Sequence, residues 1–180
     1  MTSVTEVIEA YRAKDFPGFL FFWGHHSSAD GRITKSCLSQ WYECSFTVDG
    51  VTYHTAEQYM MAQKAKLFRD EDIFQKIMSA SDPKEYKRLG RCVRDYDDSV
   101  WAANRVAIVT MGNIHKFRQN EQLARFLRQT GNKILVEASP YDCVWGIGLS
   151  ADTPSIYDPT TWRGTNLLGF SLMAVRDEIV

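Results

Sequence analysis

The sequence predicts an α+β fold, a compact and mainly helical domain with a small β-sheet built around a hairpin. The hairpin signal is strong, because the strand-like runs WYECSFTV and VTYH flank Asp49-Gly50, a dipeptide that favours a tight turn. The helical segments outnumber the strand-like runs and follow one another in mixed order, which indicates α+β or a helical bundle with a small sheet. At 180 residues we expect a single domain spanning residues 1–180.

The elements before the hairpin are a helix, a strand and a loop. Residues 3–14 have the pattern of a short amphipathic helix, and the apolar run GFLFFWG at 18–24 predicts a buried strand. The segment HHSSADGRITKSCL at 25–38 is polar and rich in turn residues, so we expect a loop there.

The elements after the hairpin are mostly helical. Residues 55–68 begin with Thr55 as cap and Gln58 at the capping-box spacing. Further helices are expected over SDPKEYKRLG, with Ser81 or Asp82 as cap and Gly90 just past the end, over 97–117, and over 120–131. KILVEA at 133–138 predicts a core strand, followed by a long loop at 139–166 and a final helix at 167–180.

Two charges lie on the apolar face of the helix at 55–68. At about 100° per residue, Glu57 and Lys64 return to nearly the same direction, whereas Gln58, Gln63 and Lys66 point elsewhere. A structural ion pair, or a lysine whose amine reaches the surface, is one interpretation. The other is a pocket in which a carboxylate and an amine carry out proton transfer or imine chemistry.

Bulk composition narrows the function classes. The net charge of −1 argues against a protein that binds nucleic acid through non-specific phosphate contacts. The four cysteines and four histidines show no metal-site spacing, so we expect no metal, and we expect reduced thiols, as in a cytosolic or nuclear protein. There is no signal peptide and no apolar run long enough to span a membrane.

The long loop is the second informative region. It places Asp142, Trp145 and Trp162 among several glycines, including Gly146. Loops of this length inside compact domains are usually functional or disordered, and tryptophan offers a flat stacking surface to a ligand. A core tryptophan in a glycine-rich turn is the alternative interpretation.

The motifs together resemble the NADAR family, also called YbiA-like N-glycosidases. The matching blocks are FFWG, the hairpin leading into TAEQYMMAQKA, SVWAANR, DCVWGIG and GTNLLGFSLMAVR, which occur in the family order between about residues 18 and 177. The polar segment at 25–38 departs from the family pattern as an insert. The resemblance implies a YbiA-like fold and cleavage of an N-glycosidic bond without metal or cofactor.

The resemblance also implies substrates and a mechanism. One substrate class is ADP-ribose attached to guanine, in a nucleotide or nucleic acid; the other is phosphoribosylamino-pyrimidine intermediates of riboflavin synthesis. The family lysine that captures the opened ribose as a Schiff base matches Lys64, and the family aspartate of the loop matches Asp142. Glu57 would move protons, and direct attack by water between the two carboxylates is the alternative. A module that binds ADP-ribose without turnover is a third possibility.

Several side chains are candidates for substrate binding. We expect the protein to be a monomer and not to act at a membrane. Aromatic rings and the glycine loop could contact the base and sugar, and basic groups could hold the diphosphate. Asn166 could face the ligand or cap the last helix. The candidates are Trp101, Trp145, Gly146, Phe22, Trp23, Arg91, Arg94, Arg105 and Asn166.

Overall fold

The computed structural model describes residues 1–179, which form two compact units. Unit 1 combines Met1–Ser39 with the chain from Gln122 onward, and unit 2 is the continuous stretch Gln40–Glu121. Helices dominate both units and the strands are short, so the expected α+β class is confirmed. The expectation of one domain over 1–180 stays a prediction. Within the described residues, no helix is long and apolar enough to cross a membrane.

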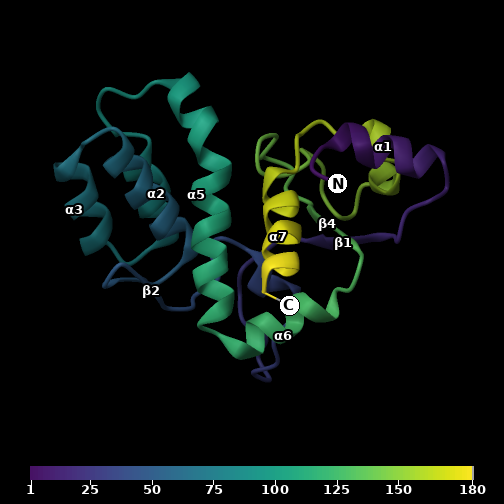
Figure 1. The fold of residues 1–180 in the computed structure, drawn as a ribbon, viewed down its shortest axis with the longest axis horizontal. Helices are drawn as coiled ribbons and strands as arrows, with labels where there is room; N and C mark the ends of the chain where they lie inside the picture. Colours follow the sequence, from purple (N-terminus) through teal and green to yellow (C-terminus); the bar gives the residue numbers. More distant parts are fainter. Residues whose placement is uncertain (180) are drawn as a thin grey trace. The chain divides into compact units, whose positions relative to one another are not determined.

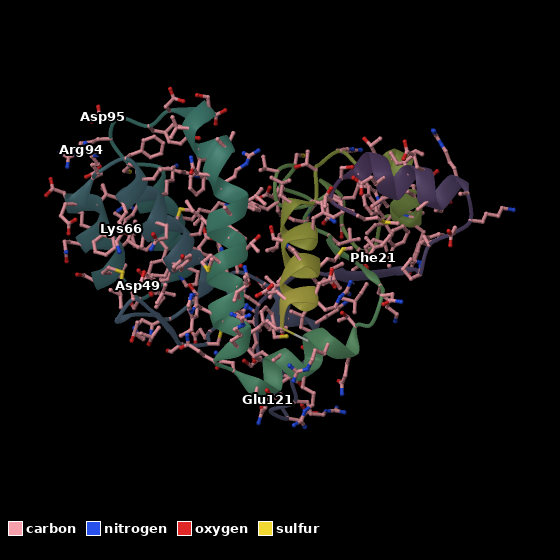
Figure 2. All side chains as sticks on the ribbon, viewed as in Figure 1. Phe21, Asp49, Lys66, Arg94, Asp95 and Glu121 are labelled. Atoms are coloured by element: carbon pink, nitrogen blue, oxygen red, sulfur yellow. The ribbon has the colours of Figure 1, made fainter. Side chains whose placement is uncertain are left out.

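The predicted hairpin opens unit 2. Strands β2 (Phe46–Val48) and β3 (Val51–Tyr53) pair antiparallel, with Phe46 opposite Tyr53. Asp49, labelled in Figure 2, and Gly50 make the turn with φ values of 49° and 78°. Two successive positive φ angles are those of the type I′ turn, which aspartate and glycine favour. The Asp-Gly prediction is therefore confirmed, although the strands are shorter than the sequence runs.

Four helices complete unit 2: α2 (Ala56–Leu67), α3 (Glu71–Ser79), α4 (Pro83–Gly90) and α5 (Asp98–Arg118). Each begins at a polar side chain that accepts a hydrogen bond from the first turn, as N-cap residues do. Thr55 caps α2 by accepting from the Gln58 amide, and Asp82, rather than Ser81, caps α4. Gln58 Oε1 in turn accepts from the His54 backbone N–H at 2.8 Å. The predicted helix starts at 55 and 97 are thus confirmed.

Helix α2 contacts three helices, α3, α4 and α5, and Figure 1 shows it between α3 and α5. The prediction that Gln58 points away from the core is wrong, because its side chain is fully buried and donates to the Ile77 carbonyl at 3.2 Å. An apolar arc read from the sequence assumes one solvent-facing side. A helix enclosed by three others needs buried polar groups with partners as well.

Close helix contacts explain two glycines of unit 2. A Cβ at Gly90 would overlap Met61 Sδ, and a Cβ at Gly112 would overlap the Tyr59 ring. The prediction that Gly90 lies past the helix end is wrong, since it is the last residue of α4. Its missing side chain allows α4 to approach α2.

Unit 1 contains a parallel strand pair from distant parts of the chain. Strand β1 (Phe19–Phe22) pairs with β4 (Ile134–Glu137), with Phe19 opposite Ile134. Residues of β4 contact α7 (Leu167–Glu178), beside which they lie in Figure 1. Strand β4 is buried, as predicted for a core strand, whereas only Phe22 of β1 is buried. The expected buried strand at 18–24 is therefore half-exposed.

The remaining elements of the chain are short. Helix α1 (Val4–Arg12) begins at the Ser3 cap, and α6 (Glu121–Gln129) is followed by Gly131 with φ of 56°, both as predicted. The segment at 25–38 is not all loop, because its end forms the 3₁₀ helix η1 (Lys35–Leu38), which buries Cys37. The long loop contains two further 3₁₀ helices, η2 (Pro154–Tyr157) and η3 (Pro159–Thr161).

Candidate active site

Three groups surround the amine of Lys64 in unit 2. Its Nζ donates to the Gly90 carbonyl at 2.8 Å, and it lies 4.1 Å from the centre of the Tyr96 ring. The Trp101 ring centre is 5.6 Å away. We call the carbonyl of Gly90 and the rings of Tyr96 and Trp101 the Lys64 cage. The half-buried amine therefore has one hydrogen-bond acceptor and two aromatic walls.

The environment lowers the pKa of Lys64. Burial is the main cause, the positive charge of Arg91 adds to it, and the negative charge of Asp98 opposes it. Taking an ammonium ion out of water disfavours its charged form. At a given pH, a larger fraction of Lys64 is therefore the neutral amine, which is the nucleophilic form, than in an ordinary lysine.

The structure brings several predicted residues to this region. Arg91 follows α4 and acts electrostatically on Lys64. Arg105 lies one turn after Trp101 on α5; burial and the bond to Asp98 raise the pKa of Tyr96, and the positive charge of Arg105 opposes that rise. Arg105 Nε makes no hydrogen bond within residues 1–179. Arg94 is different, because its guanidinium forms ion pairs with Asp70 and Asp72. Its predicted contact with a diphosphate stays a prediction.

Glu57 lies in the first turn of α2 and is 4% exposed. Its backbone N–H donates to the Gln40 carbonyl at 2.9 Å. The prediction that Glu57 is buried on this helix holds. Its proton-transfer role stays a prediction.

Sequence reasoning missed Tyr96 and Asp98. The Tyr96 hydroxyl donates to Asp98 Oδ1 at 2.8 Å, and the ring of Tyr96 lies beside the Lys64 amine. Both lie in the short segment RDYDD, where an aromatic residue among acidic groups was the available signal. No sequence signal indicates that the Gly90 carbonyl accepts from Lys64.

In unit 1, Asp142 organises the long loop. Its Oδ1 accepts from the backbone N–H groups of Val144 at 2.8 Å and Trp145 at 2.7 Å, an Asx-type turn. Trp145 is half-buried. The catalytic role expected of Asp142 and the stacking role of Trp145 stay predictions.

The loop glycines approach other backbone segments. A Cβ at Gly146 would lie 2.9 Å from the Glu137 carbonyl oxygen and 3.0 Å from that of Asp142. A Cβ at Gly164 would overlap the Gly146 carbonyl. Glycine here permits tight packing of the loop against itself and β4. The ligand contact predicted for Gly146 stays a prediction.

Asn166 stands at the N-cap position of α7, where one of its predicted roles placed it, but its side chain binds strand β4. It is fully buried, Oδ1 accepts from the Glu137 N–H at 3.0 Å, and Nδ2 donates to the Leu135 carbonyl at 2.9 Å. Its side chain makes no capping bond to α7. Both polar ends of the side chain bind β4, and the ligand contact predicted for Asn166 stays a prediction.

The aromatic candidates of β1 differ in exposure. Phe22 is 1% exposed and belongs to the core, so it offers no surface for stacking, and that prediction is wrong. Trp23 is 53% exposed and its predicted role is untested. Among residues 1–179, no group of three His, Cys, Asp or Glu side chains could hold a metal ion.

Comparison with known proteins defines the class. Residues 21–180 match the NADAR domain family. N-glycosidase R617 of Acanthamoeba polyphaga mimivirus is 43% identical over 89% of this chain and 95% of its own length. Riboflavin biosynthesis protein VVA0006 of Vibrio vulnificus is 34% identical over 79% of this chain and 35% of its own length.

A solved structure shares the fold. The NMR structure of the E. coli protein YbiA superposes with a TM-score of 0.70 at 27% identity, covering 91% of this chain and 85% of YbiA. The chain therefore has the YbiA-like α+β fold. It belongs to the NADAR domain family.

Proposed function

We propose that this chain is an N-glycosidase that removes ADP-ribose from guanine through a Schiff base on Lys64. The observation that carries the proposal is the half-buried Lys64 amine, with its lowered pKa, in contact with the Gly90 carbonyl. A buried amine of this kind is suited to attack on an anomeric carbon. R617 and YbiA, which are named N-glycosidases, support the reaction class.

The reaction balances as follows. Opening the ribose ring passes the C1–O electron pair to the ring oxygen, which takes a proton. The Lys64 amine adds its lone pair to C1, and the C1–N bond to the base breaks with its pair going to the base nitrogen, which takes a proton. Water adds to the lysine imine, the amine leaves, and the free sugar closes again. Glu57 supplies and removes these protons.

Two arginines suit the diphosphate of such a substrate. Arg91 is exposed beside Lys64, and Arg105 has an Nε that makes no hydrogen bond in the described structure. Guanidinium groups bind phosphate oxygens strongly and with defined geometry. The same groups would hold the single phosphate of a smaller substrate.

The second candidate is the same cleavage on a phosphoribosylamino-pyrimidine. It is favoured by the similarity to VVA0006, whose name places that protein in riboflavin biosynthesis. A comparison of kcat/KM on the two substrates separates the candidates. A tenfold preference for the pyrimidine would overturn the guanine assignment.

The deciding experiment mixes the full chain with ADP-ribosylated guanosine and sodium borohydride, followed by mass spectrometry. We expect free guanosine and a reduced adduct on Lys64. Lys64→Ala should remove both, whereas Lys66→Ala, a change on the exposed part of the same helix (Lys66 is labelled in Figure 2), should remove neither. Guanosine release without an adduct would leave attack by water, and ligand binding without release would indicate a binding module.

A further inference from the structure

The Lys64 cage differs from an ordinary lysine–aromatic contact. Lys66, on the same helix, has its Nζ 4.7 Å from the Phe74 ring centre, a single ring on an exposed side chain. Lys64 instead has two rings and one backbone carbonyl. The two lysines therefore form a natural pair for comparison within one molecule.

The cage supplies fewer acceptors than an ammonium ion needs. An ammonium group carries three N–H donors, and here the cage offers one carbonyl acceptor, from Gly90, and two ring faces. Partial burial of the amine restricts water at the remaining donors and disfavours that form. A protonated imine on the same nitrogen carries one N–H and one positive charge. The carbonyl can accept its single N–H, and aromatic faces attract the cation.

We propose that the Lys64 cage selectively stabilises the protonated imine of Lys64, with Tyr96 as the positioning residue. This rests on the proposed lysine mechanism and assigns Tyr96 a role in it. The protonated imine is the form that water attacks, because the positive charge draws electrons away from C1. A cage that stabilises the protonated imine favours formation of the covalent intermediate. It also keeps that intermediate in the protonated form that water attacks.

Tyr96 is held in place by its neighbours. Its hydroxyl is bonded to Asp98, the first residue of α5, and the Phe68 ring packs against it with centres 5.3 Å apart. Tyr96 is nevertheless 42% exposed, so its removal admits water without opening the core. Trp101 is 7% exposed and is a poorer choice for substitution.

The test measures imine formation with a simple aldehyde. The full-length chain is incubated with D-ribose 5-phosphate and sodium cyanoborohydride. The amine and the aldehyde give an imine and water, and hydride from the reagent reduces C1 to a stable secondary amine. Peptide mass spectrometry then gives the ratio of labelled Lys64 to labelled Lys66 in each variant. Labelled Lys66 is the internal reference, because it meets the same reagent concentration for the same time in the same sample.

We expect Tyr96→Ala to lower this ratio about tenfold, which corresponds to about 1.4 kcal/mol, the size of one partly buried contact between a cation and an aromatic ring. Tyr96→Phe keeps the ring and should stay within about twofold of the parent protein. Tyr96→Ala should also move the onset of Lys64 labelling to higher pH, with Arg91 and Asp98 as the other charges acting on the amine. Circular dichroism checks that both variants fold.

Three results would overturn the role proposed for the Lys64 cage. These are an unchanged ratio in Tyr96→Ala, an equal loss in Tyr96→Phe, and no labelling of Lys64 in the parent protein. Guanosine release from ADP-ribosylated guanosine is measured separately. If release persists while the cage test fails, the glycosidase proposal stands without the cage. If the labelling ratios of the Tyr96 variants are as expected but ADP-ribosylated guanosine is not cleaved, the proposed glycosidase function fails and the cage proposal stands.

Discussion

The contact of Gly90 with Met61 sets how closely α4 approaches α2, and Gly90→Ala tests it. The new Cβ would overlap Met61 Sδ and lie 3.0 Å from its Cγ. Met61 is 8% exposed, so its side chain has little room to move. Overpacking of this kind costs about 1–3 kcal/mol. Replacing glycine by alanine within a helix returns about 1 kcal/mol.

The net destabilisation expected for Gly90→Ala is therefore about 0–2 kcal/mol. For a chain of this size, each kcal/mol lowers Tm by about 2–4 °C. Because this range includes small values, the sharper measurement is a double-mutant cycle with Met61→Ala. In that background the nearest side-chain atom to the new Cβ is Met61 Cβ at 3.4 Å, an ordinary contact.

The cycle predicts strong coupling. Met61→Ala alone should cost about 2–5 kcal/mol through the cavity it leaves. Adding Gly90→Ala should then be neutral or stabilising, so the double variant falls short of the summed costs by about 1–3 kcal/mol. Urea unfolding of the four proteins measures this. Additive costs would refute the idea that Met61 limits the approach of α4.

Three further outcomes are expected. Asn166→Ala should destabilise the protein by about 2–4 kcal/mol in urea unfolding, because it removes the buried hydrogen bonds to the Glu137 N–H and the Leu135 carbonyl; a loss below about 1 kcal/mol would contradict this. Asp70→Asn should lower the urea midpoint at pH 7. The bonds from Arg94 hold the pKa of Asp70 well below its usual range, so the stability it adds is present above the unfolded pKa of about 3.9 and is lost as the pH falls through the lower folded pKa. The difference in urea midpoint between the parent protein and Asp70→Asn should become smaller as the pH is lowered from about 5 to about 2 in steps of about one unit. A difference that stays constant over this range would count against the pairing of Asp70 with Arg94. Since the pKa of Lys64 is lowered, its reductive labelling should begin at lower pH than that of free Nα-acetyl-lysine in the same mixture, and equal onset would show that burial does not act on the amine.

Local signals predicted the elements well. The Asp49-Gly50 turn, the Thr55 cap and the glycine after α6 each depend on a few adjacent residues, and each is confirmed. Turn and cap chemistry is local, so a sequence can indicate it directly.

Longer-range features were less accessible. Gln58 was misplaced because periodicity cannot show that α2 is enclosed by three helices. The sequence indicates Asn166 as a cap of the last helix, but it does not indicate that the side chain binds β4, about thirty residues earlier in the chain. The place of Lys64 in the helix pattern and the family resemblance indicate it as a candidate, and its catalytic role stays a prediction. The Gly90 carbonyl and Tyr96 follow only from tertiary packing.

The parallel pairing of Phe19 with Ile134 has a consequence for synthesis of the chain. Strand β1 leaves the ribosome early, but its partner β4 emerges only after all of Gln40–Glu121. The Gly90 carbonyl and the Tyr96 and Trp101 rings that contact Lys64 all lie within that stretch, so these surroundings can form before β1 has its partner strand. Non-local strand pairing is slow, and an unpaired aromatic strand is prone to aggregation. Chains stalled before residue 134 would therefore expose Phe19–Phe22 and be the natural targets of chaperones.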